Sequence, residues 1–300
     1  MADRANAKSK VLIIGGNAAL GANLMKMLAS ETTQATYYRN CPPGGIPFDV
    51  GSQDIANCVA NLGEYSHALL LPAAPSIDAC KLEENRWRHI MVDGIKRTAG
   101  RLMDAGVIPV FTSSDYVFDG NRGGYSEHDE PSAIGCYGQF KAEFENYLRA
   151  DGRPQLTIRL SKVLASVRDT RELLFNWCVE IEAGNDIRCA IDHYFCPIDA
   201  EDAVRMIVHL IQERASGLFN VCGSERVNHL QLMTHLSRAL GEYGKQQPRP
   251  GQVRECSIND LGLLEIRPHD ISMQSRKSVE ATGITPKSLY ATCRRFLKWN

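Results

Sequence analysis

The chain has 300 residues, of which 44% are hydrophobic and 23% are charged, and its length favours two domains. It has 34 Lys and Arg against 35 Asp and Glu, so its formal net charge of −1 argues against a nucleic-acid binder held by a basic face. The longest apolar run, around residues 68–74, is interrupted by Pro72 and falls well short of the about 18 residues that a membrane span needs. Residues 1–10 lack the apolar core of a signal peptide. We therefore expect a cytoplasmic protein with no nucleic-acid or membrane partner.

The ten cysteines favour free thiols over a metal site. No two of them are closer than seven residues apart, whereas zinc motifs need pairs two to about four residues apart. Cys222 lies in an apolar run, where a free thiol behaves as a small hydrophobe. We expect a reduced protein without a metal ion.

The first half of the chain alternates between predicted strands and helices. Residues 10–14 form an apolar run that ends at a glycine turn, which is typical of a strand buried in a parallel sheet. Pro109 is expected among the first residues of its strand, because it cannot donate to a sheet. The further elements are strands over 36–39, 68–71, 107–112 and 156–160, and helices over 82–102 and 140–148. This alternation predicts an α/β fold, a Rossmann-type doubly wound parallel sheet, over 1–165.

The second half, 166–300, is expected to form a smaller α/β part that binds the substrate, with the chain crossing between the two parts. Its predicted helices cover 170–183, 201–214, 228–240 and 285–298. Thr285 is expected to be the N-cap of the last helix and Pro286 its first residue. A short strand is predicted over 218–222 and an exposed linker over 241–251.

The turn after the first predicted strand has the spacing of a phosphate-binding loop. Gly15 and Gly21 occupy the outer positions of a G-x-x-G-x-x-G pattern, and Ala18 stands at the middle one. In a dinucleotide fold these positions make the tight turn, admit the pyrophosphate and let the helix pack on the strand. We expect cofactor contacts from Gly15, Asn17, Ala18, Leu20 and Gly21. The alternative is a plain strand–turn–helix connection without a ligand.

The end of the second predicted strand indicates which dinucleotide is bound. An acidic residue there would bind the adenosine 2′-hydroxyl, whereas an arginine accommodates a 2′-phosphate. Arg39 stands there, and no acidic residue precedes Asp49, which favours NADP(H) over NAD(H). Asp49 and Val50 are expected beside the adenine. The alternative is that Arg39 is only a solvated charge at a strand end.

Three residues combine into a candidate site for carbonyl chemistry. Ser114 follows the strand predicted over 107–112, at the end where an open α/β sheet places its site. Tyr137 and Lys141 are four residues apart and share one face of a helix. We expect the lysine ammonium to lower the pKa of the phenol, which then exchanges a proton with a carbonyl oxygen that the serine holds. The alternative is a Tyr–Lys pair on a helix surface.

The run SSDYVFDG at 113–120, with YG at 137–138, carries a resemblance to a known family. The chain resembles the extended short-chain dehydrogenase/reductases, and within them the dTDP-4-dehydrorhamnose reductase-like branch. The resemblance implies a catalytic triad of Ser114, Tyr137 and Lys141, with Lys141 also on the nicotinamide ribose.

The same resemblance extends over nearly the whole chain. Ala73 and Ala74 are similar to the cofactor-contacting turn of the family. The residues expected to face the substrate are Asp115, Tyr116, Lys162 and Arg267.

Several positions depart from the pattern of the branch. Met91 stands where the family usually has an asparagine that organises the lysine and a proton-relay water, and Lys162 stands where the branch has a tryptophan associated with the sugar. Ile198 replaces a threonine, and Ile271 and Met273 replace a serine and a leucine. Lys162 either pairs with a phosphate or carboxylate of a different substrate or is a charge whose head reaches water.

The resemblance implies NADPH-dependent reduction of a 4-keto nucleotide sugar or a related carbonyl. The alternative is a non-catalytic NADP(H)-binding regulatory subunit that acts through a protein partner, because the beta subunit of methionine adenosyltransferase resembles the chain in the same motif. A nucleotide-sugar epimerase or dehydratase is a third alternative. The oligomeric state stays open, a homodimer included.

Overall fold

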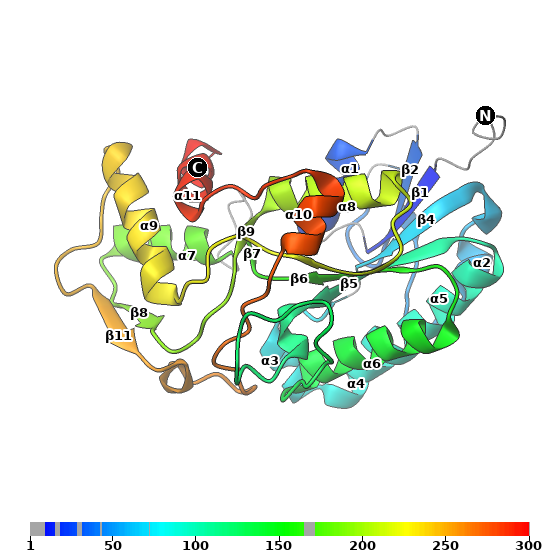
Figure 1. The fold of residues 1–300 in the computed structure, drawn as a ribbon, viewed down its shortest axis with the longest axis horizontal. Coiled ribbons are helices and arrows are strands. Elements are labelled where there is room, and N and C mark those ends of the chain that lie inside the picture. The colour runs from blue at the N-terminus through cyan, green and yellow to red at the C-terminus, as the bar shows by residue number, and fades with distance from the viewer. Residues whose placement is uncertain are drawn as a thin grey trace.

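A seven-stranded parallel sheet forms the centre of the computed structural model, which describes residues 10–15, 19–28, 32–42, 44–71, 73–164 and 172–299. The strand order is β10-β6-β5-β4-β1-β2-β3, so the chain winds outward from β1 in both directions (Figure 1). This confirms the doubly wound α/β fold. The strands are β1 (Lys10–Ile14), β2 (Thr33–Tyr37), β3 (Ile46–Pro47), β4 (Tyr65–Leu70), β5 (Ile108–Ser114), β6 (Leu156–Leu160) and β10 (Gly217–Val221).

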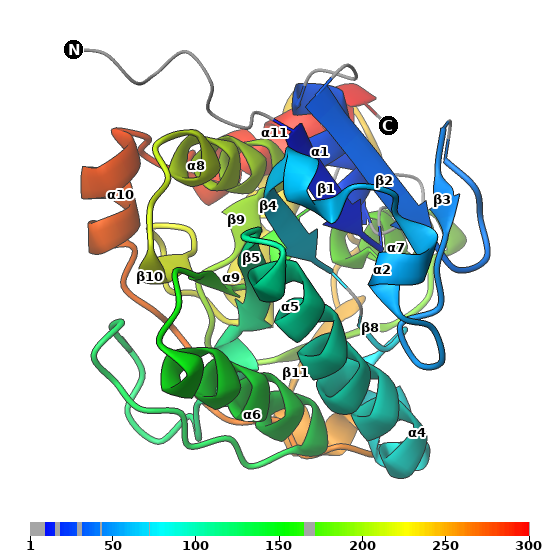
Figure 2. The ribbon, with the colours of Figure 1, turned by 90° about the vertical axis from the view of Figure 1, so that its right-hand side faces the viewer.

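Helices cover both faces of this sheet (Figure 2). One face packs against α1 (Ala19–Met27) and α8 (Ala200–Gln212), and the other against α5 (Ile95–Asp104) and α6 (Cys136–Asp151). The buried residues of α5 recur at helical spacing, as Ile95, Ala99 and Leu102 do, so the helix presents one apolar stripe to the strands. Each face of the sheet therefore has its own apolar core.

The second half of the chain forms a smaller lobe beside the sheet, on the left of Figure 1. Its helices α7 (Leu173–Ala183), α9 (His229–Glu242) and α11 (Leu289–Trp299) share an apolar core with the strand β8 (Ile187–Ala190). Strand β11 (Val253–Cys256) pairs with β8, and β7 (Val163–Leu164) pairs with β9 (Ile198–Asp199). Helix α8 and strand β10 return to the large sheet, so the chain crosses between the two parts. The division at residue 165 stays a prediction.

The long helix predicted over 82–102 is confirmed as a continuous helical run over 84–104, but the sequence did not predict the π-helical stretch inside it or the separate short helix before it. The structure has α3 (Ile77–Leu82), α4 (Glu84–Arg88), a π-helix (His89–Gly94) and then α5. Glu83 leaves the helical conformation, with φ −126° and ψ 53°, and separates α3 from α4. Gly94 is required at the end of the π-helix, because a Cβ there would stand 2.4 Å from the carbonyl oxygen of Val50.

The predicted start of the last helix is wrong. Helix α11 begins at Leu289, and just before it the backbone N–H of Lys287 donates a 2.7 Å hydrogen bond to the Asp202 carboxylate. The Ser288 hydroxyl accepts from the backbone N–H of Ala291 and so takes the capping role expected of Thr285.

The remaining predicted elements lie within about three residues of the observed ones, where the structure describes them. Strand β2 begins at Thr33, three residues earlier than predicted, and ends before Arg39. Pro109 is the second residue of β5, as expected. Cys222 is buried in an apolar cluster. The short remaining helices are α2 (Ile55–Cys58) and α10 (Arg276–Thr282).

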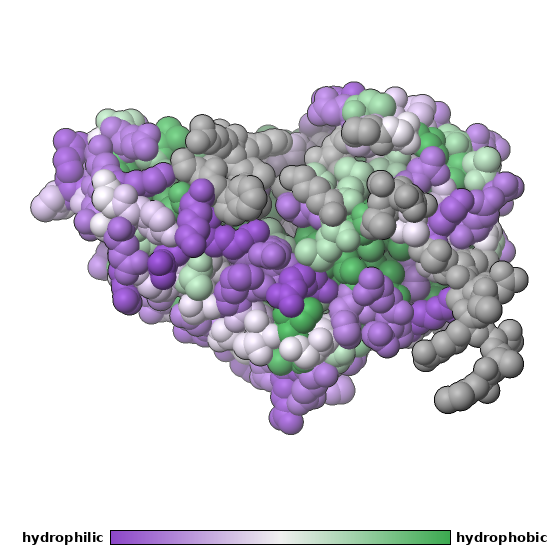
Figure 3. All heavy atoms as spheres, turned by 90° about the horizontal axis from the view of Figure 1, so that it is seen from above, coloured by the Kyte–Doolittle hydropathy of each residue, from purple (hydrophilic) through white to green (hydrophobic). Residues whose placement is uncertain are grey.

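Among the described residues, no helix has both the length and the apolar character needed to traverse a bilayer. Hydrophilic residues cover most of the face that Figure 3 presents, and hydrophobic residues reach the surface mainly in the half that holds the large sheet.

Candidate active site

Two adjacent parallel strands bring the polar residues of the candidate site to one edge of the sheet. Ser114 ends β5 and lies in register with Leu160, the last residue of β6, so Ser161 follows at the same edge. The Ser114 hydroxyl accepts a 3.3 Å hydrogen bond from the backbone N–H of Tyr116 and thereby caps the 3-10 turn Asp115–Val117. The serine is thus held at the C-terminal end of the strand, as the sequence predicted.

Helix α6 brings Tyr137 and Lys141 to this edge. The Lys141 ammonium donates a 2.8 Å hydrogen bond to the carbonyl oxygen of Thr112 and lies 5.7 Å from the centre of the Tyr137 ring. Lys141 is only 3% exposed. The ring of Tyr137 meets that of Tyr116 edge-on, with 6.1 Å between the centres. All three predicted catalytic residues therefore lie together.

Burial controls the protonation of this site. It lowers the pKa of Lys141 to about 8 and raises the pKa of Tyr137, which the charge of Asp115 raises further. Hydrogen bonding from Ser114 lowers the Tyr137 pKa, but its effect is smaller. The expected lowering of the Tyr137 pKa by Lys141 is therefore wrong for the protein alone, and Tyr137 is a neutral phenol at pH 7.

The carboxyl group of Asp115 lies directly beside the Ser114 hydroxyl. It accepts hydrogen bonds from the Ser114 hydroxyl, at 3.0 Å, and from the Ser161 hydroxyl, at 2.8 Å. Asp115 is 3% exposed, and burial raises its pKa to about 6. With this pKa, the protonated and the ionised forms of the Asp115 carboxyl group are both populated near neutral pH.

A cavity of about 650 Å³ opens onto these residues. Its lining includes all four residues that were expected to face the substrate, Asp115, Tyr116, Lys162 and Arg267. Arg267 is held by an ion pair of 2.7 Å to Asp78 of α3. The cavity also reaches Leu20 and Ala73, at the ends of the expected cofactor site.

Part of the expected cofactor site can be followed in the structure. The backbone N–H of Gly15 (φ 87°) faces the hydroxyl of Thr36, at 3.4 Å, so the glycine turn meets the end of β2. Gly21 is buried in α1, and Ala74 packs partly buried beside Tyr137. Asn17 and Ala18 lie outside the described residues.

The residues expected near the adenosine differ in how far they are available to bind a ligand. Arg39 is exposed beyond the end of β2, with its guanidinium 5.4 Å from the centre of the Tyr38 ring. Asp49 bonds its own turn, with one carboxylate oxygen on the backbone N–H of Gly51. Val50 is buried against Gly94.

A dinucleotide fits these surroundings. The cavity is lined both by Leu20, in the first turn of α1, and by Tyr137. The Ser113 hydroxyl lines it and is buried without a hydrogen-bond partner among the described residues, so a ligand could satisfy it.

Two histidines in the cavity wall were missed by the sequence reasoning. His193 forms a 2.6 Å hydrogen bond through Nδ1 to the carbonyl oxygen of Pro268, and the His229 ring centre is 5.6 Å from the His193 ring centre. Burial lowers the pKa of both, that of His229 to about 4. Because they come from a loop and from the first turn of α9, no local motif marks them.

The departures from the family pattern fall into two groups. Lys162 and Ile271 line the cavity, whereas Ile198 lies in the buried strand β9 and Met273 in an apolar cluster beneath the site. Met91 belongs to the π-helix and is 2% exposed, with its sulfur 3.9 Å from the Cys80 sulfur.

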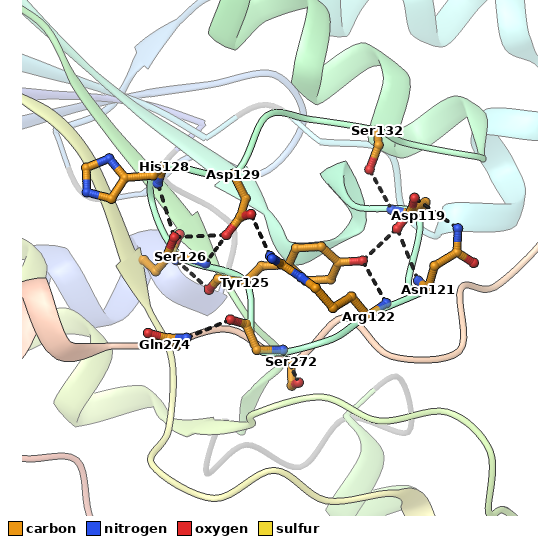
Figure 4. A network of polar contacts seen from close by, with 12 residues as sticks. Asp119, Asn121, Arg122, Tyr125, Ser126, His128, Asp129, Ser132, Ser272 and Gln274 are labelled. Carbon is orange, nitrogen blue, oxygen red and sulfur yellow. Dashed lines mark hydrogen bonds and ion pairs between the residues drawn. The ribbon is translucent and has the colours of Figure 1, made fainter.

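The segment that joins β5 to α6 is held by its own polar network (Figure 4). The Tyr125 hydroxyl donates a 2.6 Å hydrogen bond to Asp119, and Asp129 accepts from the Ser126 hydroxyl at 2.8 Å. Gln274 ties the segment to the second half of the chain: its backbone N–H donates a 2.8 Å hydrogen bond to the Tyr125 carbonyl oxygen, and its side-chain amide donates one of 2.8 Å to the Gly124 carbonyl oxygen. The network fixes the connection between Ser114 and Tyr137.

Residues 9–299 match the family described as RmlD substrate binding domain. The chain is 28% identical over 238 residues to the probable low-salt glycan biosynthesis reductase Agl14 of Haloferax volcanii, which covers 76% of this chain and 79% of that protein. It is 22% identical over 206 residues to methionine adenosyltransferase 2 subunit beta of Bos taurus, which covers 62% of each.

Solved structures share the fold. A dTDP-4-dehydrorhamnose reductase from Bacillus anthracis in complex with NADP has a TM-score of 0.79 at 21% identity, over 98% of this chain and all of that one. MoeE5 in complex with UDP-glucose and NAD has a TM-score of 0.80 at 19% identity, over 97% of this chain and 98% of that one.

Proposed function

The chain belongs to the RmlD substrate binding domain family, and we propose that it is an NADPH-dependent reductase of a 4-keto nucleotide sugar or a related carbonyl. The observation that carries the proposal is the convergence of Ser114, Tyr137 and Lys141 on one cavity. The relatives named as reductases, and MoeE5 with its bound UDP-glucose, support the substrate class.

In the proposed reaction each residue of the site has its own role. Reduced nicotinamide supplies hydride to the carbonyl carbon when it is bound. Tyr137, protonated at pH 7, gives its phenolic proton to the carbonyl oxygen, which becomes a hydroxyl. Ser114 orients that oxygen, and the Lys141 ammonium stabilises the phenolate that Tyr137 leaves behind. The product is the corresponding alcohol.

Arg39 supports NADP(H) over NAD(H) as the cofactor. It is exposed at the end of β2, where a 2′-phosphate would lie, and the Asp49 carboxylate is engaged with its own turn. We expect NADPH to bind at least tenfold more tightly than NADH, and Arg39→Ala to abolish that preference while leaving NADH affinity unchanged. Fluorescence titration with both nucleotides measures the two dissociation constants.

The deciding experiment measures NADPH oxidation with a panel of 4-keto nucleotide sugars. Turnover on one of them should fall about 10²-fold or more in Tyr137→Phe. Tyr147→Phe is the matched control, because Tyr147 lies on the same helix but lines a different cavity. Tight NADPH binding without turnover on any member of the panel would refute a reductase of this class.

A second candidate is a regulatory subunit that binds NADP(H) and acts through a protein partner. The similarity to methionine adenosyltransferase 2 subunit beta favours it, as do two hydrophobic side chains, Leu264 (59% exposed) and Ile266 (54% exposed), beside the cavity residue Arg267. In that case NADPH would change the association with a co-purifying protein, and Tyr137→Phe would leave that change intact. Light scattering and pull-down with and without NADPH separate the two candidates.

A further inference from the structure

Asp115 is a buried acid with no basic partner. Among the described residues no lysine, arginine or histidine forms an ion pair with it, and its hydrogen bonds come from the hydroxyl groups of Ser114 and Ser161 and from the backbone of its own turn. The titratable groups that interact with it are Tyr116, Tyr137 and the thiols of Cys196 and Cys222. A buried carboxyl group in these surroundings retains its proton to higher pH than an exposed one.

Tyr137 has few groups from which it can recover a proton. The Lys141 ammonium bonds the Thr112 carbonyl oxygen, and the described side chains that pack around Tyr137 on the other side are apolar or neutral thiols, Cys80, Met91, Val92, Cys136 and Phe140. Burial raises the pKa of Cys80 to about 12, so this thiol does not exchange a proton near neutral pH.

Ser114 connects the two groups. It lines the same cavity as Tyr137, hydrogen bonding from its hydroxyl lowers the pKa of that phenol, and the same hydroxyl is 3.0 Å from Oδ1 of Asp115. A hydroxyl group can accept a proton on one side and release one on the other. Because Asp115 also lines the cavity, it is in reach of solvent that enters there.

We propose that Asp115 is the proton reservoir of the site and that it reprotonates Tyr137 through Ser114. The inference rests on the proposed reductase function. After Tyr137 has given its proton to the substrate oxygen, the Ser114 O–H bond breaks and its proton forms the new O–H bond of Tyr137. The carboxyl proton of Asp115 passes to the Ser114 oxygen, and the resulting carboxylate takes a proton from solvent. Asp115 is thus a positioning and relay residue that acts through Ser114.

The test is the pH dependence of kcat for NADPH oxidation over many turnovers, measured with the ketone of the panel that is reduced fastest, because Tyr137 must recover its proton before each new turnover. Because reprotonation needs the acid form of Asp115, the wild-type rate should decline above an ionisation near pH 6. Asp115→Asn keeps the size of the side chain but cannot supply a carboxyl proton. We expect its rate at pH 6 to fall at least tenfold and its profile to lose this ionisation, with unchanged NADPH affinity.

Ser161→Ala is the second variant. This variant removes the hydrogen bond from Ser161 to Oδ2 of Asp115, the oxygen that Ser114 does not contact. Because that bond stabilises the carboxylate, its loss should shift the ionisation seen in the rate profile to higher pH. A lower rate with an unaltered profile would mean a structural role only.

The outcomes separate the two proposals. If the wild type is active, the relay is overturned when the ionisation is still present in Asp115→Asn or when it does not shift in Ser161→Ala. Either result leaves the reductase proposal intact. If Asp115→Asn does not fold, Ser161→Ala decides. A wild type that reduces no ketone of the panel overturns both.

Discussion

Gly138 approaches the carbonyl oxygen of Tyr116 so closely that a Cβ at residue 138 would stand 2.0 Å from it. This contact lets α6 begin directly against the turn that follows β5. Tyr137, the residue before the glycine, is thereby brought beside Ser114, the residue before that turn.

Gly138→Ala should therefore damage the site. A methyl group does not fit between the two backbones, so α6 or the turn must move, and we expect the free energy of unfolding to fall by about 1–3 kcal/mol. The displacement of Tyr137 should lower kcat about 10²-fold. Gln139→Ala, at the exposed next position of the same helix, is the control. Denaturant unfolding and the ketone assay measure both effects, and an alanine variant with wild-type activity would contradict the packing argument.

Lys162→Ala should weaken substrate binding. The residue lines the cavity, and none of the described carboxylates forms an ion pair with it. If its charge meets a substrate phosphate or carboxylate, the KM should rise about tenfold while the dissociation constant of NADPH stays the same. Lys162→Arg should retain most of the affinity. An unchanged KM in the alanine variant would mean that the lysine head only reaches water.

Replacing only one partner of the buried ion pair between Arg159 and Glu145 should strongly lower the free energy of unfolding. Arg159 on β6 is 2% exposed and bonds the Glu145 carboxylate of α6 at 2.7 Å. Arg159→Met leaves a buried carboxylate without its partner and should lower the free energy of unfolding by about 3–5 kcal/mol. Replacing both residues, Arg159→Met with Glu145→Leu, should recover most of that loss. Urea unfolding of the single and double variants tests this, and a double variant no more stable than the single one would refute it.

His67 should make the protein sensitive to acid. This residue of β4 is 1% exposed, its Nε2 has no hydrogen-bond partner among the described residues, and burial lowers its pKa to about 4. The unfolded imidazole titrates near 6.5, so the unfolded chain binds protons first as the pH falls. The stability present above pH 6.5 is therefore lost toward pH 4, by roughly 3 kcal/mol in full.

His67→Leu removes this ionisation, so its free energy of unfolding should fall less steeply between pH 6.5 and pH 4 than that of the wild type. Exposed His128 offers the control variant, His128→Gln. Unfolding curves at several pH values give the slopes, and equal slopes for His67→Leu and the wild type would contradict the assignment.

The class of the fold and the residues of the proposed triad could be predicted from local patterns and the family resemblance. The apolar run of β1 predicted a buried strand because both faces of a parallel sheet are covered, and the Tyr137–Lys141 spacing placed both side chains on one helical face. The helix predicted over 82–102 is present over 84–104, but no local spacing predicted its π-helical stretch His89–Gly94, in which Gly94 packs closely against Val50.

The alternation of strands and helices, the glycine turn and the candidate residues Ser114, Tyr137 and Lys141 could be predicted from the sequence, because each is encoded in residues that are close together in the chain. The tertiary structure alone decided what surrounds them. It placed His193 and His229 in the cavity wall and left Asp115 buried without an ion-pair partner among the residues that the structure describes. It also reversed the expected direction of the Tyr137 pKa, because desolvation depends on how much protein covers a group and no local spacing encodes that.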